Sequence, residues 1–333
     1  MPASEKRFGC LGVFIVVLLC LSLLFNALFL VGSFFGMAGA GPLRFNENVL
    51  TEGATGVKSK IAVIRLGGLI SSGDMGFSMG VSPQEVRQQF KQALDDKEVR
   101  AIVLAIDSPG GEVTASDDIY NIIRKAREKK KIVVSMGAMA ASGGYYAALG
   151  GSHIIARDTT FTGSIGVIMQ TLNYSELFGK VGLQMVTFKS GKMKDMLSGS
   201  RPSTQEERDY VQALVMQTYG KFVGIVAAER KIPEDTLRNG VADGRVLSGK
   251  DALAAKLIDE IGDLDAAVKK AIELGSAPGA TVVEYRAIES LSRYFRLFGK
   301  ADSSRKVEIH LGPQSALNLQ PGRLYLLPEI LAP

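Results

Sequence analysis

An uninterrupted apolar run near the N-terminus is the first feature of the chain. No charged residue occurs from residue 8 to residue 43, and this run exceeds the roughly 20 apolar residues that cross a bilayer as a helix. Lys6 and Arg7 precede the run, and the positive-inside rule places such an N-terminus in the cytoplasm. We therefore predict cytoplasmic residues 1–7, one transmembrane helix over 8–37 and an exported body.

The same run has a second interpretation as a cleaved signal peptide. Ala38, Gly39 and Ala40 form the small-x-small pattern at which such peptides are cut. The apolar core of a signal peptide is only about 7–15 residues long, so we favour an uncleaved anchor. The expected location is the cell membrane, with a single pass and the body on the extracytoplasmic side.

Beyond a polar linker at 38–57, short apolar runs alternate with amphipathic stretches. The apolar runs have the length and β-branched content of buried strands, and they cover 61–70, 101–107, 131–137, 153–158 and 185–189. The amphipathic stretches show helical spacing, and they cover 83–96, 115–131, 204–230, 248–262 and 264–275. Strands that alternate with helices predict an α/β domain with a largely parallel sheet over 58–275. Residues 276–333 are left as a C-terminal extension and tail.

Composition and charge exclude several classes of protein. The 39 lysines and arginines outnumber the 34 aspartates and glutamates, which gives a net charge of only +5. The sequence has no long basic arm. We therefore expect no nucleic-acid partner. Cys10 and Cys20 both fall in the apolar run, and His153 and His310 are the only histidines. We accordingly expect no disulfide framework, no metal ion and no cofactor.

A serine among small residues is the first candidate for chemistry. Ser142 follows the predicted strand 131–137 within the sequence AASGG, and YYAALGG after it is typical of a short helix. A strand-to-helix corner can expose a nucleophilic hydroxyl and hold backbone N–H groups near developing negative charge. The alternative is that Ser142 merely caps the helix. The turn DSPGG at 107–111 could supply further N–H groups, because its glycines leave the backbone open.

A serine nucleophile also needs a base. Neither histidine has a convincing setting, so a Ser-His-Asp triad is poorly supported. A lysine can replace histidine when burial lowers its pKa enough to leave the amine neutral. Lys189, Lys192 and Lys194 stand together from the last residue of the predicted strand 185–189 onward, and their spacing alone does not choose among them.

Four motifs together carry a resemblance to a known family, and they are DSPGG (107–111), SMGAMAASGGYY (135–146), FTGSIGV (161–167) and KSGKMKDM (189–196). They resemble the signal peptide peptidase A (SppA) family of membrane-bound serine proteases, which belongs to the Clp-protease and crotonase-like fold group. The resemblance covers roughly residues 58 to 275 in order. The resemblance implies a Clp-protease and crotonase-like fold for the body of the chain.

The resemblance also implies a role for individual residues. Ser142 matches the nucleophile and Lys194 the general base, while Ser164 matches a serine that hydrogen-bonds the base. Backbone N–H groups of Gly143 and Gly111 match the oxyanion donors. The short members of the family assemble into octamers, and a single-domain member is expected to pair Ser142 with Lys194 of a neighbouring subunit.

The implied function is cleavage of residual signal peptides and other apolar peptides at the membrane surface, through an acyl-enzyme. The expected partners are these peptides, the membrane and further copies of the chain in a homo-octamer. Two alternatives from other classes are a crotonase-like acyl-CoA enzyme and a non-catalytic membrane scaffold.

Overall fold

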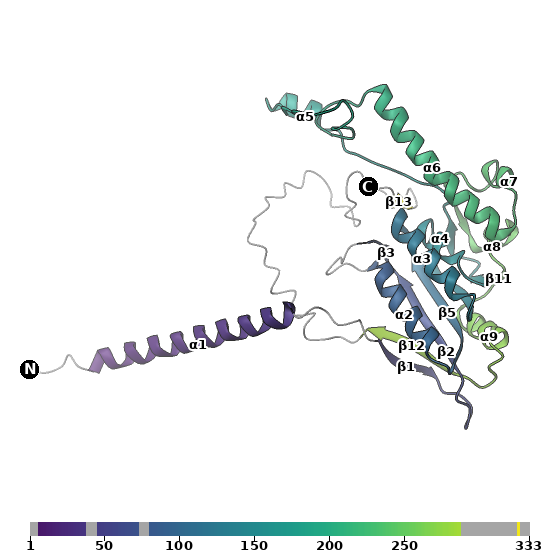
Figure 1. Cartoon of the computed structure of the whole chain (residues 1–333), viewed down its shortest axis with the longest axis horizontal. Helices are drawn as coiled ribbons and strands as arrows, with labels where there is room; N and C mark the ends of the chain where they lie inside the picture. The colour runs from purple at the N-terminus through teal and green to yellow at the C-terminus, as the bar shows by residue number, and fades with distance from the viewer. Residues whose placement is uncertain (1–5, 38–44, 73–79, 288–324, 327–333) are drawn as a thin grey trace, which may run out of the picture. The chain divides into compact units, whose positions relative to one another are not determined.

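The structure is a computed structural model, which describes residues 6–37, 45–72, 80–287 and 325–326 (Figure 1). Its contacts divide the chain into two units. One unit is Met1–Arg44 with Ala287–Leu311, and the other is Phe45–Arg286 with Gly312–Pro333. Helix α1 (Lys6–Met37) belongs to the first unit, and all further helices and strands lie in the second apart from the last residue of β12.

A mostly parallel sheet forms the centre of the second unit (Figure 1). Its strands follow the order β1-β12-β2-β5-β7-β8-β11, and all pairs from β12 to β11 are parallel. β9 extends it beside the end of β7, and β10 pairs with β9 in the antiparallel sense. The strands are β1 (Phe45–Thr51), β2 (Lys60–Gly67), β5 (Val99–Ser108), β7 (Lys131–Ala141), β8 (His153–Ala156), β9 (Phe161–Gly163), β10 (Val246–Ser248), β11 (Glu260–Ile261) and β12 (Thr281–Ala287).

A second, small sheet lies where β2 and β5 end. It has the order β13-β6-β3-β4, with β3 parallel to β4 and β6, and β13 antiparallel to β6. Its strands are β3 (Leu69–Ile70), β4 (Gly80–Val81), β6 (Gly111–Glu112) and β13 (Tyr325–Leu326). The last of these comes from the C-terminal tail, so two distant parts of the sequence meet here.

Helices surround the main sheet, and their ends follow local sequence signals. Ser82 caps α2 by accepting a hydrogen bond from the Glu85 N–H at 3.3 Å. Thr204 and Glu207 form a complete capping box at the start of α6. The helices of the second unit are α2 (Pro83–Asp95), α3 (Val113–Ala126), α4 (Gly143–Ala148), α5 (Ser175–Lys180), α6 (Gln205–Arg230), α7 (Glu234–Arg238), α8 (Gly249–Ala254) and α9 (Leu264–Leu274).

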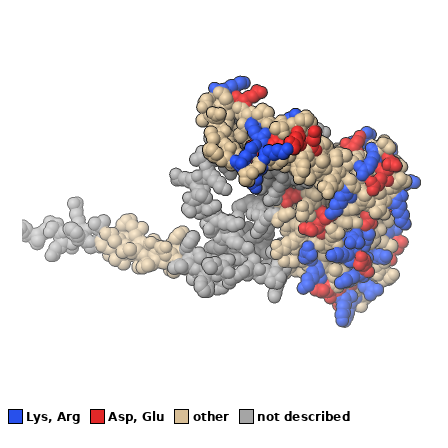
Figure 2. All heavy atoms as spheres, turned by 45° about the horizontal axis from the view of Figure 1, so that its top comes forward, with Lys and Arg blue, Asp and Glu red and all other residues tan. Residues whose placement is uncertain are grey.

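Apolar side chains on both faces of the sheet form the core. Ile61, Val63 and Val103 pack with Ala267 and Ala271 of α9 on one face. Because side chains alternate along a strand, the intervening buried residues of β2 and β5 face the other side. Burial on both faces explains why these strands are continuous apolar runs. On the outer surface, basic and acidic side chains are intermixed in the view of Figure 2.

The α/β class and the largely parallel sheet are confirmed, but one predicted strand is wrong. Residues 185–189 form no strand, and Phe188 is 95% exposed there. An apolar run alone does not make a strand, because a strand also needs a neighbour to pair its backbone groups. The predicted helix 248–262 is shorter, since α8 ends at Ala254 before Lys256 with its φ of 60°. β1 and β12 extend the sheet beyond the range 58–275.

Helix α1 covers the apolar run near the N-terminus. Side chains within it are described for residues 12–27, and all of these are exposed. Among the residues that the structure describes, no helix has both the length and the apolar character of a membrane span. The predicted span at 8–37 is therefore not confirmed.

Candidate active site

Ser142 lies at a tight corner between β7 and α4. Its backbone has φ 51° and ψ −112°, a conformation that side-chain-bearing residues seldom adopt. Its N–H donates to the Gly163 carbonyl at 2.8 Å, which fixes the corner against β9. Such a conformation costs of order 1–3 kcal/mol and persists only where the surroundings enforce it.

The hydroxyl of Ser142 does not cap the helix that follows. It makes no capping hydrogen bond, it is fully buried, and its Oγ has no hydrogen-bond partner within the described part of the chain. The interpretation of Ser142 as a plain helix cap is therefore wrong. A buried hydroxyl without a partner is costly in a folded protein, which makes this serine a candidate for chemistry.

The glycines of two loops meet beside Ser142. A Cβ added to Gly143 would lie 3.0 Å from the Gly111 amide nitrogen, and one added to Gly110 would lie 2.6 Å from the Gly143 amide nitrogen. Gly110 also has φ +105°, which favours glycine. Ser108 holds the turn, because its Oγ accepts from the Gly110 N–H at 3.1 Å and donates to the Gly68 carbonyl at 2.6 Å. The structure thus places the amides of Gly111 and Gly143 side by side.

Ser164 lies next to this corner through strand pairing. Ala141 of β7 pairs with Gly163 of β9, so Ser142 and Ser164 follow directly after two paired residues. Ser164 is buried with φ 49°, and its N–H donates to the Arg245 carbonyl at 2.9 Å. It borders a cavity of about 840 Å³ between residues 164–171, α6 and residues 243–245.

The three candidate lysines differ in their partners. Lys189 Nζ pairs with Asp195 at 2.7 Å, and Lys192 Nζ pairs with Glu206 of α6 at 2.6 Å. Lys194 is exposed and makes no ion pair with any residue that the structure describes. Arg201 also binds Asp195 at 2.7 Å, and these contacts hold the pKa of Asp195 well below its usual range. Lys194 is therefore the lysine whose amine is not already engaged.

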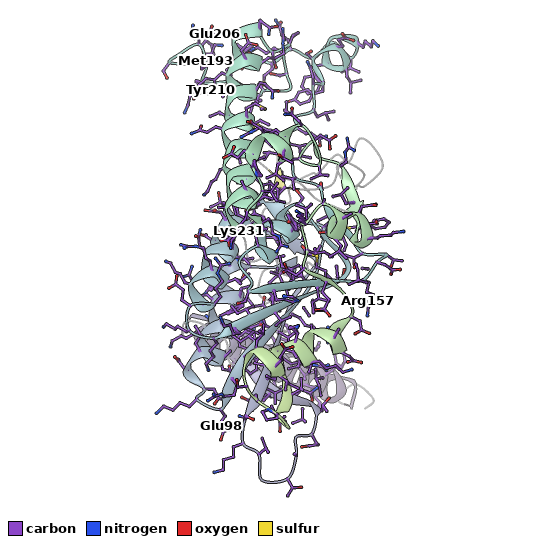
Figure 3. All side chains as sticks on the ribbon, turned by 90° about the vertical axis from the view of Figure 1, so that its right-hand side faces the viewer. Glu98, Arg157, Met193, Glu206, Tyr210 and Lys231 are labelled. Carbon is purple, nitrogen blue, oxygen red and sulfur yellow. The ribbon has the colours of Figure 1, made fainter. Side chains whose placement is uncertain are left out.

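Lys194 nevertheless lies far from Ser142 within one chain. Figure 3 shows the neighbouring Met193 beside Glu206 at the N-terminal end of α6. Tyr146 of α4 instead contacts Phe222, with ring centroids 4.8 Å apart. Glu206 and Phe222 are separated by about 24 Å along the helix, at 1.5 Å per residue. The structure brings Ser142, Gly143, Gly111 and Ser164 together and does not bring Lys194 to them.

The histidine alternative fails on geometry. His153 starts β8 and pairs with Val133, near the beginning of β7, whereas Ser142 follows the end of β7. Its Nε2 lies 3.1 Å from a Glu260 oxygen. Within the part of the chain that the structure describes, His153 belongs to no Ser-His-Asp triad, and His310 lies outside that part.

Aromatic residues after Ser142 anchor α4, a feature that sequence reasoning missed. The Tyr146 hydroxyl donates to Asp117 at 2.7 Å, and Lys221 of α6 binds the same carboxylate at 2.7 Å. Burial and this hydrogen bond raise the pKa of Tyr146 far above its ordinary value, so the phenol stays a donor. The paired tyrosines of the motif were the available signal. Tyr146 connects the helix that follows Ser142 to both α3 and α6.

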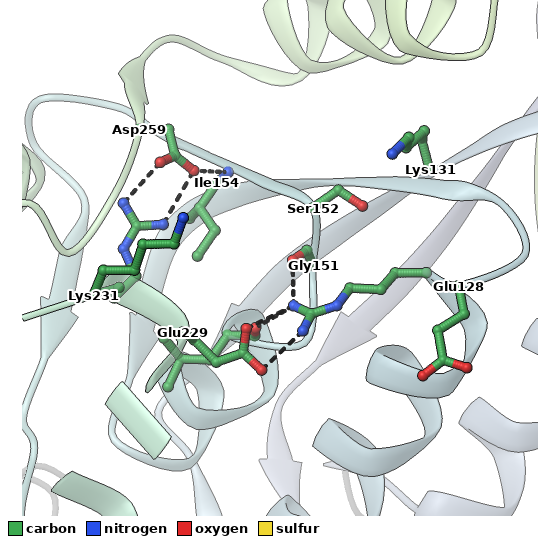
Figure 4. A pocket seen from close by; sticks show the side chains of 11 residues that line it. Glu128, Lys131, Gly151, Ser152, Ile154, Glu229, Lys231 and Asp259 are labelled. Carbon is green, nitrogen blue, oxygen red and sulfur yellow. Dashed lines mark hydrogen bonds and ion pairs between the residues drawn. The ribbon is translucent and has the colours of Figure 1, made fainter. Parts of the chain in front are cut away.

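A second cavity of about 610 Å³ is structural in character (Figure 4). Its charged side chains are largely paired with one another, as Arg127 binds Glu229 at 2.8 Å and Arg230 binds Asp259 at 2.7 Å. These pairs tie the end of α6 to α3 and to the loop before β11. None of the candidate site residues lines this cavity.

Comparisons with known proteins cover the same region. A family model described as Peptidase family S49 matches residues 124–277, and one described as Clp protease matches residues 82–160. The first range contains Ser142, Ser164 and Lys194, and the second contains Gly111, Ser142 and Gly143.

The names of three relatives agree with these family matches. "Putative signal peptide peptidase SppA" of Enterococcus faecium is 35% identical over 252 residues, which are 74% of this chain and 72% of the relative. "Serine protease SPPA, chloroplastic" of Arabidopsis thaliana is 34% identical, covering 68% of this chain and 34% of the relative. "Protease 4" of Salmonella typhi is 34% identical, covering 69% of this chain and 37% of the relative.

Proposed function

Since the chain belongs to the SppA family of serine proteases, peptidase family S49, we propose that it is a membrane-anchored endopeptidase for residual signal peptides and other apolar peptides. One observation carries the proposal. The buried hydroxyl of Ser142 has no hydrogen-bond partner among the residues that the structure describes, and it lies beside the amides of Gly111 and Gly143. Membership of a peptidase family leaves no support for the acyl-CoA enzyme and the non-catalytic scaffold.

The mechanism we propose is acyl transfer through Ser142. Its Oγ bonds to the scissile carbonyl carbon while its proton passes to the neutral amine of Lys194. The N–H groups of Gly111 and Gly143 stabilise the negative charge on the carbonyl oxygen. The C–N bond then breaks as the leaving amine takes the proton from Lys194. Water, deprotonated by the same lysine, hydrolyses the acyl-enzyme and frees Ser142.

The base in this proposal comes from a neighbouring copy of the chain. Support comes from the separation of Lys194 and Ser142 along α6 and from the exposed apolar surface near Lys194. We call the segment 172–188 the arm; its exposed apolar side chains include Leu172, Leu183, Val186 and Phe188. An exposed apolar patch of this kind usually marks an interface. A homo-octamer would cover the arm and supply Lys194 to the next subunit.

The anchor in this proposal is α1. Support comes from its apolar sequence, from its exposed side chains over 12–27 and from Lys6 and Arg7 before the run. Such an anchor would hold the protease where apolar peptide fragments remain after secretion. Protease added to intact spheroplasts should degrade the body and spare a short N-terminal fragment. Full protection of the body would contradict the extracytoplasmic location.

Covalent labelling tests the nucleophile directly. The full chain in detergent micelles is treated with a serine-directed acylating probe, and the modified residue is identified by mass spectrometry. We expect label on Ser142 and none in Ser142→Ala. Ser135→Ala, which alters another buried serine of β7, is the matched control and should label like the wild type. Equal labelling of Ser142→Ala would exclude Ser142 as the nucleophile.

A further inference from the structure

Strand β7 changes its neighbours just before Ser142. Its residues up to Met136 pair with β5 and β8, and those from Met139 onward pair with β9. Between these two parts the register with β5 shifts, so that residues 137–139 of β7 lie opposite a single residue of β5, Asp107. We call residues 137–139 the bulge. Bulges interrupt the regular ladder of backbone hydrogen bonds, and next to active sites they redirect a strand.

Two side chains supply hydrogen bonds to the backbone of the bulge. The Met139 N–H donates to Asp107 Oδ1 at 3.0 Å. From the other side, Thr160 Oγ1 donates to the Gly137 carbonyl at 2.7 Å. Thr160 is itself fixed, because it is buried and its Oγ1 accepts from the Arg157 N–H at 3.1 Å. A Cβ added to Gly137 would lie 3.1 Å from the Asp107 Cγ, so glycine allows the close approach of this carboxylate.

Asp107 is linked to both loops of the candidate site. Its backbone carbonyl accepts from the Gly68 N–H at 3.0 Å, which fixes it beside the end of β2. It begins the DSPGG turn, whose last residue, Gly111, carries one of the proposed oxyanion donors. Its side chain binds Met139, three residues before Ser142. One residue thus connects the turn that holds an oxyanion donor to the strand that holds the nucleophile.

We propose that Asp107 is a positioning residue, whose hydrogen bond to Met139 sets the place of Ser142 Oγ relative to the oxyanion donors. Without this bond the Met139 N–H would lose its partner, and the end of β7 would shift relative to the DSPGG turn. Attack on a carbonyl depends on atomic positions to within about 1 Å, whereas binding of a peptide tolerates such a shift. The effect on catalysis rests on the proposed function, whereas the effect on the strand does not.

Paired substitutions at Asp107 test the hydrogen bond. Because Asp107 is exposed, its variants should fold, and urea unfolding of the full chain in detergent micelles checks this. Asp107→Ala removes the acceptor, and we expect kcat for an apolar fluorogenic peptide to fall about tenfold, with KM unchanged within about twofold. Asp107→Asn keeps an oxygen acceptor and should retain kcat within about twofold. Asp118→Ala, which alters an exposed aspartate of α3, is the matched control and should behave like the wild type.

Hydrogen exchange gives a readout that does not depend on catalysis. The amides over 137–142 should exchange several-fold faster in Asp107→Ala than in the wild type and in Asp107→Asn. Unchanged exchange or unchanged kcat in Asp107→Ala would overturn the proposal, and so would an equal loss of kcat in the alanine and asparagine variants. Faster exchange in Asp107→Ala, in a protein whose wild type cleaves no peptide, would contradict the proposed function alone.

Discussion

The two halves of the candidate dyad lie in very different surroundings. The β7–α4 corner is buried, fixed by the hydrogen bond from Ser142 to Gly163 and flanked by glycine loops. The segment 189–201 is exposed or half-buried apart from Gly199, and it is held to the start of α6 by ion pairs such as Arg201 with Glu207. One chain therefore holds the proposed nucleophile and oxyanion donors together but leaves the proposed base on the surface. This difference underlies the proposal that a neighbouring chain completes the site.

The largest effect on kcat is expected from removal of the proposed base, Lys194. Lys194→Ala should lower kcat by roughly 10⁴-fold or more, because Ser142 then has no proton acceptor. Lys192→Ala is the matched control and should change kcat little, since Lys192 pairs with Glu206. Peptide hydrolysis by the full chain measures both. Mixing Lys194→Ala with Ser142→Ala subunits should restore part of the activity. No recovery would place the base within the same chain.

Gly143→Ala should disrupt the proposed oxyanion donors beside Ser142. The added Cβ would lie 2.5 Å from Ser116 Oγ and 3.0 Å from the Gly111 amide, so the oxyanion donors must separate. We expect kcat to fall about 10²–10³-fold with a smaller change in KM. Gly220→Ala in α6, where the added Cβ meets only the Arg238 side chain at 3.8 Å, should retain activity. An unchanged kcat in Gly143→Ala would remove Gly143 from the oxyanion site.

Phe188→Asp should weaken assembly and so separate Ser142 from Lys194 of the neighbouring subunit. This aromatic side chain is 95% exposed on the arm, and a charge there opposes an apolar interface. We expect smaller particles by light scattering and lost activity that returns as protein concentration rises. Leu253→Asp alters an exposed apolar residue of α8 and serves as the control. Full assembly of Phe188→Asp would contradict the role of the arm.

Arg201→Gln should loosen the segment 189–201 without altering the β7–α4 corner. Arg201 is the main cause of the lowered pKa of Asp195, so the stability that their pairing contributes is fully present above the ordinary pKa of a carboxyl and is lost as the pH falls through the lowered pKa. At pH 7 we expect faster hydrogen exchange over 189–201 in Arg201→Gln and a kcat reduced several-fold. The wild type should lose protection over 189–201, relative to the intrinsic exchange rate at each pH, only at acid pH. Arg208→Gln, an exposed arginine of α6, is the control, and equal exchange in both variants would contradict the prediction.

Tyr146→Phe should have the smallest effect. It removes the hydrogen bond to Asp117, and the free energy of unfolding should fall by about 1 kcal/mol. Because α4 follows Ser142, kcat should fall modestly as well. Urea unfolding and peptide hydrolysis measure the two effects. Tyr210→Phe alters a half-exposed tyrosine of α6, and equal stability of the two variants would show that the Asp117 contact is unimportant.

Local sequence signals determined much of the fold. The amphipathic stretch 204–230 predicted α6, and the apolar runs predicted β2, β5, β7 and β8, because helical spacing and strand burial depend on nearby residues and on composition. The four motifs also singled out Ser142, Ser164, Gly111 and Gly143, which the structure places together. The apolar run at 185–189 led to a wrong strand prediction. Its side chains fit the pattern of a strand, but its backbone has no neighbouring strand with which to pair.

Only the tertiary structure decided how the distant parts combine. No local pattern predicts that β13 pairs with β6, because backbone pairing depends on neighbours more than 200 residues apart in sequence and not on residue type. The same holds for Lys194, whose position is set by the length and direction of α6. The sequence therefore identifies the chemical groups of this protease. Their separation within one chain, and the pairing of β13 with β6, follow from packing over long sequence distances.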